Sequence, residues 1–275
     1  MKPSSPRPER HIDTLPNALA ELDRLTARLA GQHLAIFLDY DGTLTPICAD
    51  PAQAMLGEAM RARIAALASR ACLAVISGRD TADVQAKVGL PELYYAGSHG
   101  LEIRGPDGFH EERAQDYLPA LATARQRLMQ ALTGVDGVLV EPKRYAIAVH
   151  YRAAPEARER VHRCVEQIAA AEPRLRTSHG KKIIEIRPAL DWHKGRAVEY
   201  LRGELPLPDG HIALYIGDDL TDEDAFAALG PADLGLIVAD GEDNDRTSFA
   251  DYRLPDVAGV GQMLEAIERT AAPAP

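Results

Sequence analysis

The sequence predicts an α/β protein: a doubly wound, mostly parallel, Rossmann-like sheet with a smaller α+β domain inserted into it. Three observations support this prediction. Short, wholly apolar runs alternate with helix-like segments, which is typical of parallel sheets covered by helices on both faces. Charged and hydroxyl side chains follow the ends of several of these runs. One internal segment departs from the alternation and contains paired strand patterns instead.

The elements of the α/β part follow in order along the chain. Leucines recur at helical spacing over residues 15–29 and predict an amphipathic helix. The apolar runs predict buried strands at 34–38, 73–77, 93–98, 213–217 and 234–239. Further helices are expected at 55–68, 81–88, 222–229 and 257–268. A Gly-Pro-Asp-Gly turn at 105–108 predicts a hairpin.

The segment 113–190 predicts the inserted α+β domain. Its patterns run helix, two strands, helix, two strands, at 118–132, 138–152, 155–171 and 175–188. We therefore expect an α/β core made of 16–112 and 191–275, interrupted by this domain. Residues 1–15 match no such pattern, and we expect a disordered tail there.

The composition argues against several classes of protein. Hydrophobic residues make up 46% and charged residues 26% of the 275 residues, as in ordinary globular proteins. No apolar run approaches the roughly 20 residues of a membrane-spanning helix, and the N-terminal residues lack the apolar core of a signal peptide. The three cysteines are far apart and form no zinc-binding pattern. We expect a cytoplasmic protein with no membrane partner.

The charges are distributed unevenly. Residues 216–256 hold twelve acids and two bases, whereas residues 113–190 hold fourteen Lys or Arg and eight Asp or Glu. Such segments could bind a cation and an anion respectively, and solvated helix faces are the alternative. Nucleic acid is not expected, because no dense basic run occurs and aromatic residues are only 5%.

Polar residues gather where four predicted strands end. Ligands of open α/β sheets bind beyond the carboxyl ends of the strands. The residues there are Asp39, Asp41, Gly42 and Thr43 after the first strand, Ser77 and Arg79 after the second, His99 after the third, and Asp218 and Asp219 after the fourth. Converging carboxylates are unfavourable unless a cation compensates them, and oxygen ligands favour Mg²⁺. Acidic turns and N-caps are the alternative for any single Asp, but DxDGT together with GDD favours a metal site.

Several motifs carry a resemblance to a known family. LAIFLDYDGTLTPI, VISGRD, the HKG at 193–195 and YIGDDLTDEDAF resemble, in order, the four motifs of the haloacid dehalogenase-like phosphatases. AGSHGLEIR, the EPK…HYR stretch and KKIIEIRP make the chain similar, more narrowly, to trehalose-6-phosphate phosphatases. The resemblance runs from about Leu34 to the C-terminus.

The resemblance implies a role for each candidate residue. Asp39 would be the nucleophile that becomes an aspartyl phosphate, Asp41 the general acid and base, and Lys194 a further catalytic group. Mg²⁺ would be held by Asp39, by the backbone carbonyl of Asp41 and by Asp218, with Asp219 acting through water or as support. Phosphate would be bound by Gly42, Thr43, Ser77 and Lys194. The inserted domain would be a cap over the sugar, and Glu141, Lys143 and Glu185 would bind the glucose hydroxyls. Arg79 is expected either to contact substrate or to hold a loop.

The expected function is therefore Mg²⁺-dependent hydrolysis of trehalose 6-phosphate, a small-molecule substrate, without an obligate protein partner. A related phosphatase for another sugar phosphate, a phosphotransferase and a non-catalytic sugar-phosphate sensor are the alternatives; intact Asp39 and Asp41 argue against the sensor. For the cap residues, cross-strand pairing on a sheet surface is the alternative. The residues whose roles the sequence leaves open are His99, His150, Arg152, Lys181, Lys182 and Asp222. Glu223 and Asp224 are expected to interact favourably with the helix dipole.

Overall fold

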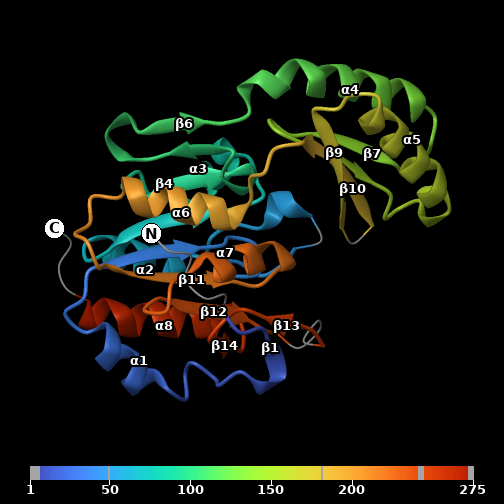
Figure 1. The fold of residues 1–275 in the computed structure, drawn as a ribbon. Helices are drawn as coiled ribbons and strands as arrows, with labels where there is room; N and C mark the ends of the chain where they lie inside the picture. The colour runs from blue at the N-terminus through green and yellow to red at the C-terminus, as the bar shows by residue number, and fades with distance from the viewer. Residues whose placement is uncertain (1–6, 49, 181, 241–244, 272–275) are drawn as a thin grey trace. The chain divides into compact units, whose positions relative to one another are not determined.

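The chain forms two compact units in the computed structural model, which describes residues 7–48, 50–180, 182–240 and 245–271. The core unit comprises Met1–His110 and Trp192–Pro275, and the insert unit comprises Glu111–Asp191. Their elements are labelled in Figure 1. Among the described residues, none of the helices combines the length and the apolarity needed to span a bilayer.

An eight-stranded sheet forms the centre of the core unit. Its strand order is β14-β12-β11-β2-β3-β4-β5-β6. The strands are β2 (Leu34–Leu38), β3 (Cys72–Ile76), β4 (Tyr94–Gly97), β5 (Glu102–Arg104), β6 (His110–Glu112), β11 (Ile212–Gly217), β12 (Leu234–Val238) and β14 (Tyr252–Leu254). All neighbours from β14 to β4 are parallel, and β5 pairs antiparallel with β4. The predicted mostly parallel α/β sheet is thus confirmed.

Helices cover both faces of this sheet because its central strands are apolar on both sides. Alternate residues of β2 belong to two separate buried clusters, Ile36 to one and Phe37 to the other. Ile36 shares its cluster with residues of α1 (Leu22–Leu29), α2 (Glu58–Ala68), α3 (Thr81–Val88) and α8 (Val257–Thr270). Phe37 shares its cluster with residues of α6 (Lys194–Glu204) and α7 (Glu223–Ala228). Figure 1 shows α6 and α7 lying along the sheet in the core unit.

The insert unit is a small α+β layer structure, as its sequence pattern predicts. Its antiparallel sheet has the order β7-β8-β10-β9. The elements are α4 (Leu118–Ala131), β7 (Leu139–Pro142), β8 (Ile147–His150), α5 (Arg158–Ala170), β9 (Leu175–Gly180) and β10 (Ile183–Pro188). Val149 and Ile184 pack with the apolar residues of α4 and α5 on one face of the sheet. The residues that alternate with them along β8 and β10 are therefore on the other face.

Short 3₁₀ segments connect several of these elements. They are η1 (Ile12–Thr14), η2 (Pro51–Gln53), η3 (Ser98–Gly100), η4 (Pro106–Gly108), η5 (Gln115–Tyr117), η6 (Pro155–Ala157) and η7 (Leu220–Asp222). The η4 segment forms the turn between β5 and β6, so the predicted hairpin is confirmed.

The predicted helix over 15–29 is wrong in its first half, because α1 begins only at Leu22. Pro16 lacks an N–H group, and its carbonyl accepts a hydrogen bond from Arg253 N at 3.0 Å. Ala18 N donates to Arg253 O at 2.8 Å. These residues therefore run beside β14 instead of forming helical turns. Leu15 and Ala18 are nevertheless buried.

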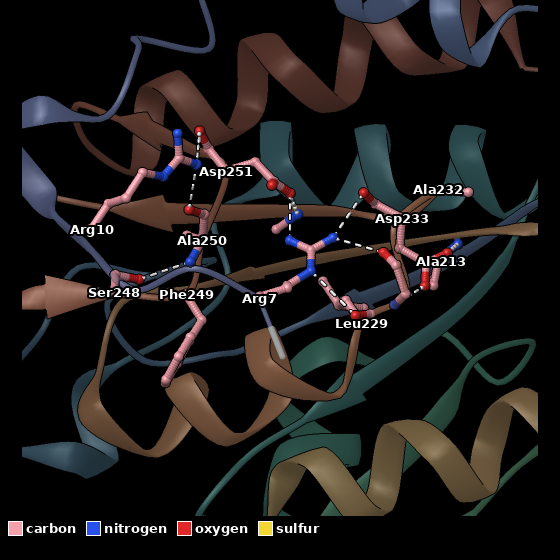
Figure 2. Close-up of polar contacts among 12 residues, drawn as sticks. Arg7, Arg10, Ala213, Leu229, Ala232, Asp233, Ser248, Phe249, Ala250 and Asp251 are labelled. Atoms are coloured by element: carbon pink, nitrogen blue, oxygen red, sulfur yellow. Dashed lines mark hydrogen bonds and ion pairs between the residues drawn. The ribbon is translucent and has the colours of Figure 1, made fainter. Parts of the chain in front are cut away.

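The expected disordered tail is wrong for residues 7–15, whereas residues 1–6 lie outside the described part. The strand β1 (Arg10–His11) pairs antiparallel with β13 (Thr247–Ser248), and Ile12 is buried. The Arg7 guanidinium donates to the Asp251 carboxylate and to three backbone carbonyls, those of Leu229, Gly230 and Asp233. Figure 2 shows Arg7 among these partners. Residues 7–15, which show no apolar periodicity, are thus held by hydrogen bonds and by the burial of Ile12. The composition of the segment does not reveal these contacts.

Candidate active site

The candidate site lies at the carboxyl edge of the core sheet. Strands β11, β2 and β3 are adjacent and parallel, so they end at the same edge. Asp218, Asp39 and Ser77 directly follow these three strands. The structure therefore brings together residues that are far apart in the chain, as the sequence pattern predicts.

Lys194 lies between two carboxylates in the interior of the site. Its Nζ is 2.7 Å from Asp39 Oδ1 and 2.7 Å from Asp222 Oδ1. The relative exposures are 3% for Lys194, 4% for Asp39 and 0% for Asp222. Buried charges are stable only when paired, and each of these three has its partner in the same cluster.

Asp218 joins this cluster through a close approach to the loop that follows β2. Gly42 has φ of +85°, and a Cβ built on it would lie 2.0 Å from Asp218 Oδ2. Thr43 Oγ1 donates to Asp218 Oδ1 at 3.2 Å. Only glycine combines this backbone conformation with space for the carboxylate, so Gly42 is required here for its missing side chain.

The charges of the cluster favour a bound cation. Burial raises the pKa of the Asp39 carboxyl well above its ordinary value, although the Lys194 ammonium opposes this. Burial and the neighbouring Asp222 carboxylate raise the pKa of Asp218 to about 7. Burial lowers the pKa of Lys194, but Asp222 and Asp39 outweigh it and leave that pKa above its ordinary value. Three carboxylates around one ammonium have excess negative charge, which a divalent cation would compensate.

The geometry of the carboxylates also fits a metal ion. Oxygens of Asp39, Asp218 and Asp222 lie within 4.8 Å of one another. Together with the space left by Gly42 beside Asp218, this oxygen donor set suits a hard divalent cation. The acidic cluster can therefore hold a metal.

Asp222 is the residue of this site that the sequence left open. Its Oδ2 accepts hydrogen bonds from Asp218 N and Asp219 N at 3.1 and 2.9 Å, and its Oδ1 accepts from Tyr215 as well as from Lys194. Asp222 thus connects the loop after β11 to the buried lysine. Asp222 also caps the helical turn, because its carboxylate accepts from Asp219 N. Its complete burial and its bond with Lys194 make it part of the site as well.

Asp219, which is expected to act on the metal through water or as support, begins a helical turn in the structure. Its carboxylate accepts a hydrogen bond from Leu220 N and caps η7, in a capping box with Asp222. It does not belong to the group formed by Asp39, Asp218 and Asp222 in the described residues. The two adjacent aspartates therefore have different positions: Asp218 faces the cluster, and Asp219 begins the helical turn.

Arg79 lies on Asp41 in the structure. Its Nε and Nη2 donate to the two carboxylate oxygens of Asp41 at 2.6 and 2.7 Å. Nη1 donates to Asp83 at 2.9 Å, and Nη2 also donates to Pro51 O at 2.8 Å. The bidentate geometry fixes the direction of the Asp41 carboxylate. The structure thus assigns to Arg79 a contact that the sequence did not reveal.

Two predicted phosphate-binding groups already have protein partners. Gly42 N donates to Thr45 O at 2.7 Å, which closes the loop after β2. Ser77 is buried, and its Oγ accepts from Arg79 N at 3.1 Å. Its hydroxyl hydrogen remains available to direct at an anion, since a hydroxyl both accepts and donates. His99, left open by the sequence, lies against Gly78, where a Cβ would be 3.0 Å from the imidazole ring.

The predicted sugar-binding residues lie on one face of the insert sheet. The register aligns Glu141 with Ala148 and Ala148 with Glu185. Lys143 Nζ donates to Glu185 Oε1 at 2.9 Å, and His150 Nε2 lies 2.7 Å from Glu141 Oε2. These residues form a polar patch, named here the insert patch, opposite the face that packs on α4 and α5.

Arg187 is a cation of the insert patch that the sequence patterns did not single out. It follows Glu185 on β10, and its Nε lies 3.8 Å from Glu185 Oε2. Burial lowers the pKa of this guanidinium. Of the residues left open, Lys182 has φ of +65° in the turn before β10, and Lys181 lies outside the described residues. Arg152 is exposed just after β8.

Comparisons with known proteins show the family to which the chain belongs. The model of the trehalose-phosphatase family matches residues 37–258. Trehalose-phosphate phosphatase of Mycobacterium tuberculosis (strain H37Rv) is 40% identical over 273 residues, covering 97% of this chain and 69% of the relative. The C-terminal domain of Candida albicans trehalose-6-phosphate phosphatase superposes with a TM-score of 0.76 at 24% identity, covering 94% of this chain and 99% of that one.

A haloacid dehalogenase-like hydrolase from Bacteroides thetaiotaomicron shares the fold, with a TM-score of 0.63 at 15% identity and coverage of 86% and 99%. The chain thus has the fold of a haloacid dehalogenase-like hydrolase, with an aspartate cluster at the carboxyl edge of its sheet. More narrowly, the chain belongs to the trehalose-phosphatase family.

Proposed function

We propose that this chain hydrolyses trehalose 6-phosphate to trehalose and inorganic phosphate, as a Mg²⁺-dependent phosphoric monoester hydrolase. The observation that carries the proposal is the buried Asp39–Lys194–Asp222 cluster beside Asp218, in a chain that the trehalose-phosphatase model matches over residues 37–258. The substrate is a small sugar phosphate.

Asp39 is the proposed nucleophile. A carboxylate oxygen of Asp39 attacks phosphorus, the bond between phosphorus and the sugar oxygen breaks, and Asp41 gives its proton to that oxygen. A water then attacks the aspartyl phosphate and loses a proton to Asp41, and phosphate leaves as the Asp39 carboxylate re-forms. Arg79 donates to both oxygens of the ionised Asp41 carboxylate, so we assign Arg79 to orienting Asp41 rather than to contacting the sugar. For the first step, Asp41 takes the proton that it later gives to the sugar oxygen from solvent, and one of these two hydrogen bonds opens.

Lys194, Thr43 and Ser77 are proposed to hold the phosphoryl oxygens. Lys194 is anchored by Asp39 and Asp222, so its ammonium is fixed where negative charge develops during transfer. Gly42 contributes mainly the space beside Asp218, because its N–H already bonds Thr45 O.

Asp39 and Asp218 would hold the metal directly, and the backbone carbonyl of Asp41 is the further proposed ligand. Asp222 supports them, since its oxygens already accept four hydrogen bonds. Mg²⁺ is the proposed ion because all the donors are oxygens. When bound, it would neutralise the phosphoryl group and draw it to Asp39. Asp219, whose carboxylate caps η7, is proposed to act on the metal through water or as support.

The insert patch is proposed to bind the glucose units. Glu141, Lys143 and Glu185 combine acceptors and donors that suit sugar hydroxyls. Their present partners include one another, His150 and Arg187, and sugar hydroxyls would take the place of some of these contacts. The expected cytoplasmic location remains part of the proposal, on the evidence of three separate free cysteines.

Turnover of a panel of sugar phosphates tests the proposal. Full-length protein treated with EDTA should be inactive, and Mg²⁺ should restore activity. Trehalose 6-phosphate should have the highest kcat/KM in the panel. A higher value for glucose 6-phosphate or another sugar phosphate would favour the related sugar phosphatase instead. Full activity in a verified metal-free sample would contradict the metal assignment.

A further inference from the structure

The loop that carries Asp218 is held by charged side chains from two directions. On one side, Asp222 accepts a hydrogen bond from Asp218 N. On the other side, Arg246 Nη2 donates to Asp218 O at 2.7 Å. Both polar groups of the Asp218 backbone are therefore bonded to ionised side chains, which fixes the direction in which its carboxylate leaves the chain.

Arg246 is itself held firmly. Its Nη1 donates to Glu223 Oε1 at 2.7 Å, and its carbonyl accepts from Ile12 N at 3.0 Å. The Arg246 and Glu223 side chains are 19% and 15% exposed, so solvent competes little for this ion pair. The guanidinium thus acts as a rigid fork between Glu223 and the Asp218 peptide.

Glu223 connects this fork to the segment around β13. Its Oε2 accepts from Ser248 Oγ at 3.0 Å and from Phe249 N at 2.9 Å. Glu223 was expected only to interact with the helix dipole, as a residue of a first helical turn. Its hydrogen-bonding partners instead join α7, β13 and, through Arg246, the Asp218 loop.

We infer that Arg246, together with Glu223, is a positioning residue that sets the affinity of the site for its divalent cation by orienting Asp218. The inference rests on the proposed function, because it concerns the metal proposed there. Groups that orient metal ligands without touching the metal commonly change metal affinity by 10- to 100-fold when they are removed. The Arg246 side chain bonds the Asp218 backbone and Glu223, rather than the acid cluster oxygens or the phosphate-binding groups.

The experiment measures Mg²⁺ affinity without relying on turnover. Wild type, Arg246→Met and Glu223→Gln are freed of metal as full-length proteins. Their thermal unfolding midpoint is then followed against Mg²⁺ concentration, which reports the dissociation constant by linkage. We expect Arg246→Met to raise this constant about tenfold or more. The Mg²⁺ concentration for half-maximal activity should rise by the same factor, while kcat at saturating Mg²⁺ changes by less than about threefold.

Arg202→Met is the matched control. It removes an ion pair of the same unit, Arg202 Nη1 to Asp233 Oδ2 at 2.6 Å, at the end of α6, and it should leave the Mg²⁺ dissociation constant unchanged. If Arg246→Met does not fold, Arg246→Lys takes its place, because lysine keeps the charge but cannot span both acceptors.

Three outcomes separate the possibilities. A raised dissociation constant in the Arg246 and Glu223 variants but not in Arg202→Met supports the inference. A lower midpoint in metal-free Arg246→Met with an unchanged Mg²⁺ constant would show a structural role only and overturn it. A wild type that neither binds nor needs Mg²⁺ would instead contradict the metal of the proposed function.

Discussion

The acid cluster of the core unit and the insert patch use charged side chains in opposite ways. In the core, Asp39, Lys194 and Asp222 are buried, and each charge is paired within the cluster. In the insert, the side chains of Glu141 and His150 are 43% and 31% exposed, and they pair across a sheet surface. The first arrangement fixes groups in place before any ligand arrives, whereas the second keeps them hydrated.

This difference suits the two tasks that we propose. Exposed ion pairs contribute about 0–1 kcal/mol, so the insert patch can exchange its Glu141–His150 pair for sugar hydroxyls at small cost. The Lys143–Glu185 pair is only 24% and 16% exposed, so its exchange should cost more. Breaking a buried pair costs about 3–5 kcal/mol because it leaves an uncompensated charge. The core should therefore tolerate almost no change, and the insert should lose specificity gradually.

The largest effect is expected for Asp39→Asn. An amide cannot form the acyl phosphate, so kcat should fall at least about 1,000-fold for trehalose 6-phosphate and for a small aryl phosphate alike. Steady-state kinetics on both substrates, with circular dichroism to verify folding, measures this. Asp13→Asn, the same chemical change at a side chain that is 65% exposed, should keep full activity. Residual activity above about 5% would exclude covalent catalysis through Asp39.

Gly42→Ala should have the next largest effect. The new methyl group would have to displace the Asp218 carboxylate, since its position lies 2.0 Å from Oδ2, and the φ of +85° adds strain. We expect kcat/KM to fall about 10- to 1,000-fold on both substrates.

Gly210→Ala is the matched control for this variant. Gly210 has the same φ of +85°, but no atom lies within 4 Å of the position that an added Cβ would occupy. It therefore reports the backbone strain alone, about 1–2 kcal/mol of stability, without loss of activity. Equal losses of activity in the two alanine variants would contradict the role given to the space beside Asp218.

The sheet and part of the site could be predicted from the sequence, and the roles of some residues could not. The apolar runs that became β2 and β11 predict both the sheet and the edge where Asp39 and Asp218 meet, because parallel strands place their carboxyl ends together. Asp222 caps a helical turn, and the sequence gives no sign of its second role in the acid cluster. That role depends on its complete burial against Tyr215 and Lys194.

The remaining errors have a similar origin in contacts distant along the chain. The helix predicted from residue 15 fails because Pro16 and Ala18 bond Arg253, from the far end of the chain. Arg79 and Asp41 are paired across two different strand ends, so neither local pattern carries a signal for the pair. Hydrophobic periodicity reveals which face is buried, but it does not identify the partner of a polar group.

The insert patch should give an intermediate and substrate-dependent effect. Glu185→Ala or Lys143→Ala should remove contacts worth about 1–3 kcal/mol to trehalose 6-phosphate, or about 5- to 150-fold in kcat/KM. A small aryl phosphate has no glucose for these residues to hold, so its hydrolysis should change little. The ratio of kcat/KM for the two substrates measures the difference.

Glu159→Ala is the control within the same unit, because Glu159 pairs with Arg163 on the exposed surface of α5. Its ratio of kcat/KM for trehalose 6-phosphate to kcat/KM for the aryl phosphate should equal that of the wild type. Equal losses on both substrates in Glu185→Ala would mean that the patch supports the fold of the insert rather than sugar recognition.

The smallest expected effect concerns stability alone and lies away from both sites. The Arg7 side chain is 9% exposed and bonds the Asp251 carboxylate and three carbonyls around the start of β12. Arg7→Ala removes these four hydrogen bonds, although Gly230 O keeps its bond from Asp233 N and the Asp251 carboxylate keeps its bond from Gly235 N. The free energy of unfolding should therefore fall by about 1–3 kcal/mol, while kcat stays unchanged.

Urea unfolding of the full chain measures this, with Arg24→Ala as the control. Arg24 is 73% exposed and pairs with Glu21 within one turn, so its loss should change stability by less than about 0.5 kcal/mol. If the two variants proved equally stable, the contacts of Arg7 would be no stronger than those of an exposed ion pair. A fall confined to Arg7→Ala would show that buried polar contacts hold a segment for which hydrophobic pattern predicted disorder.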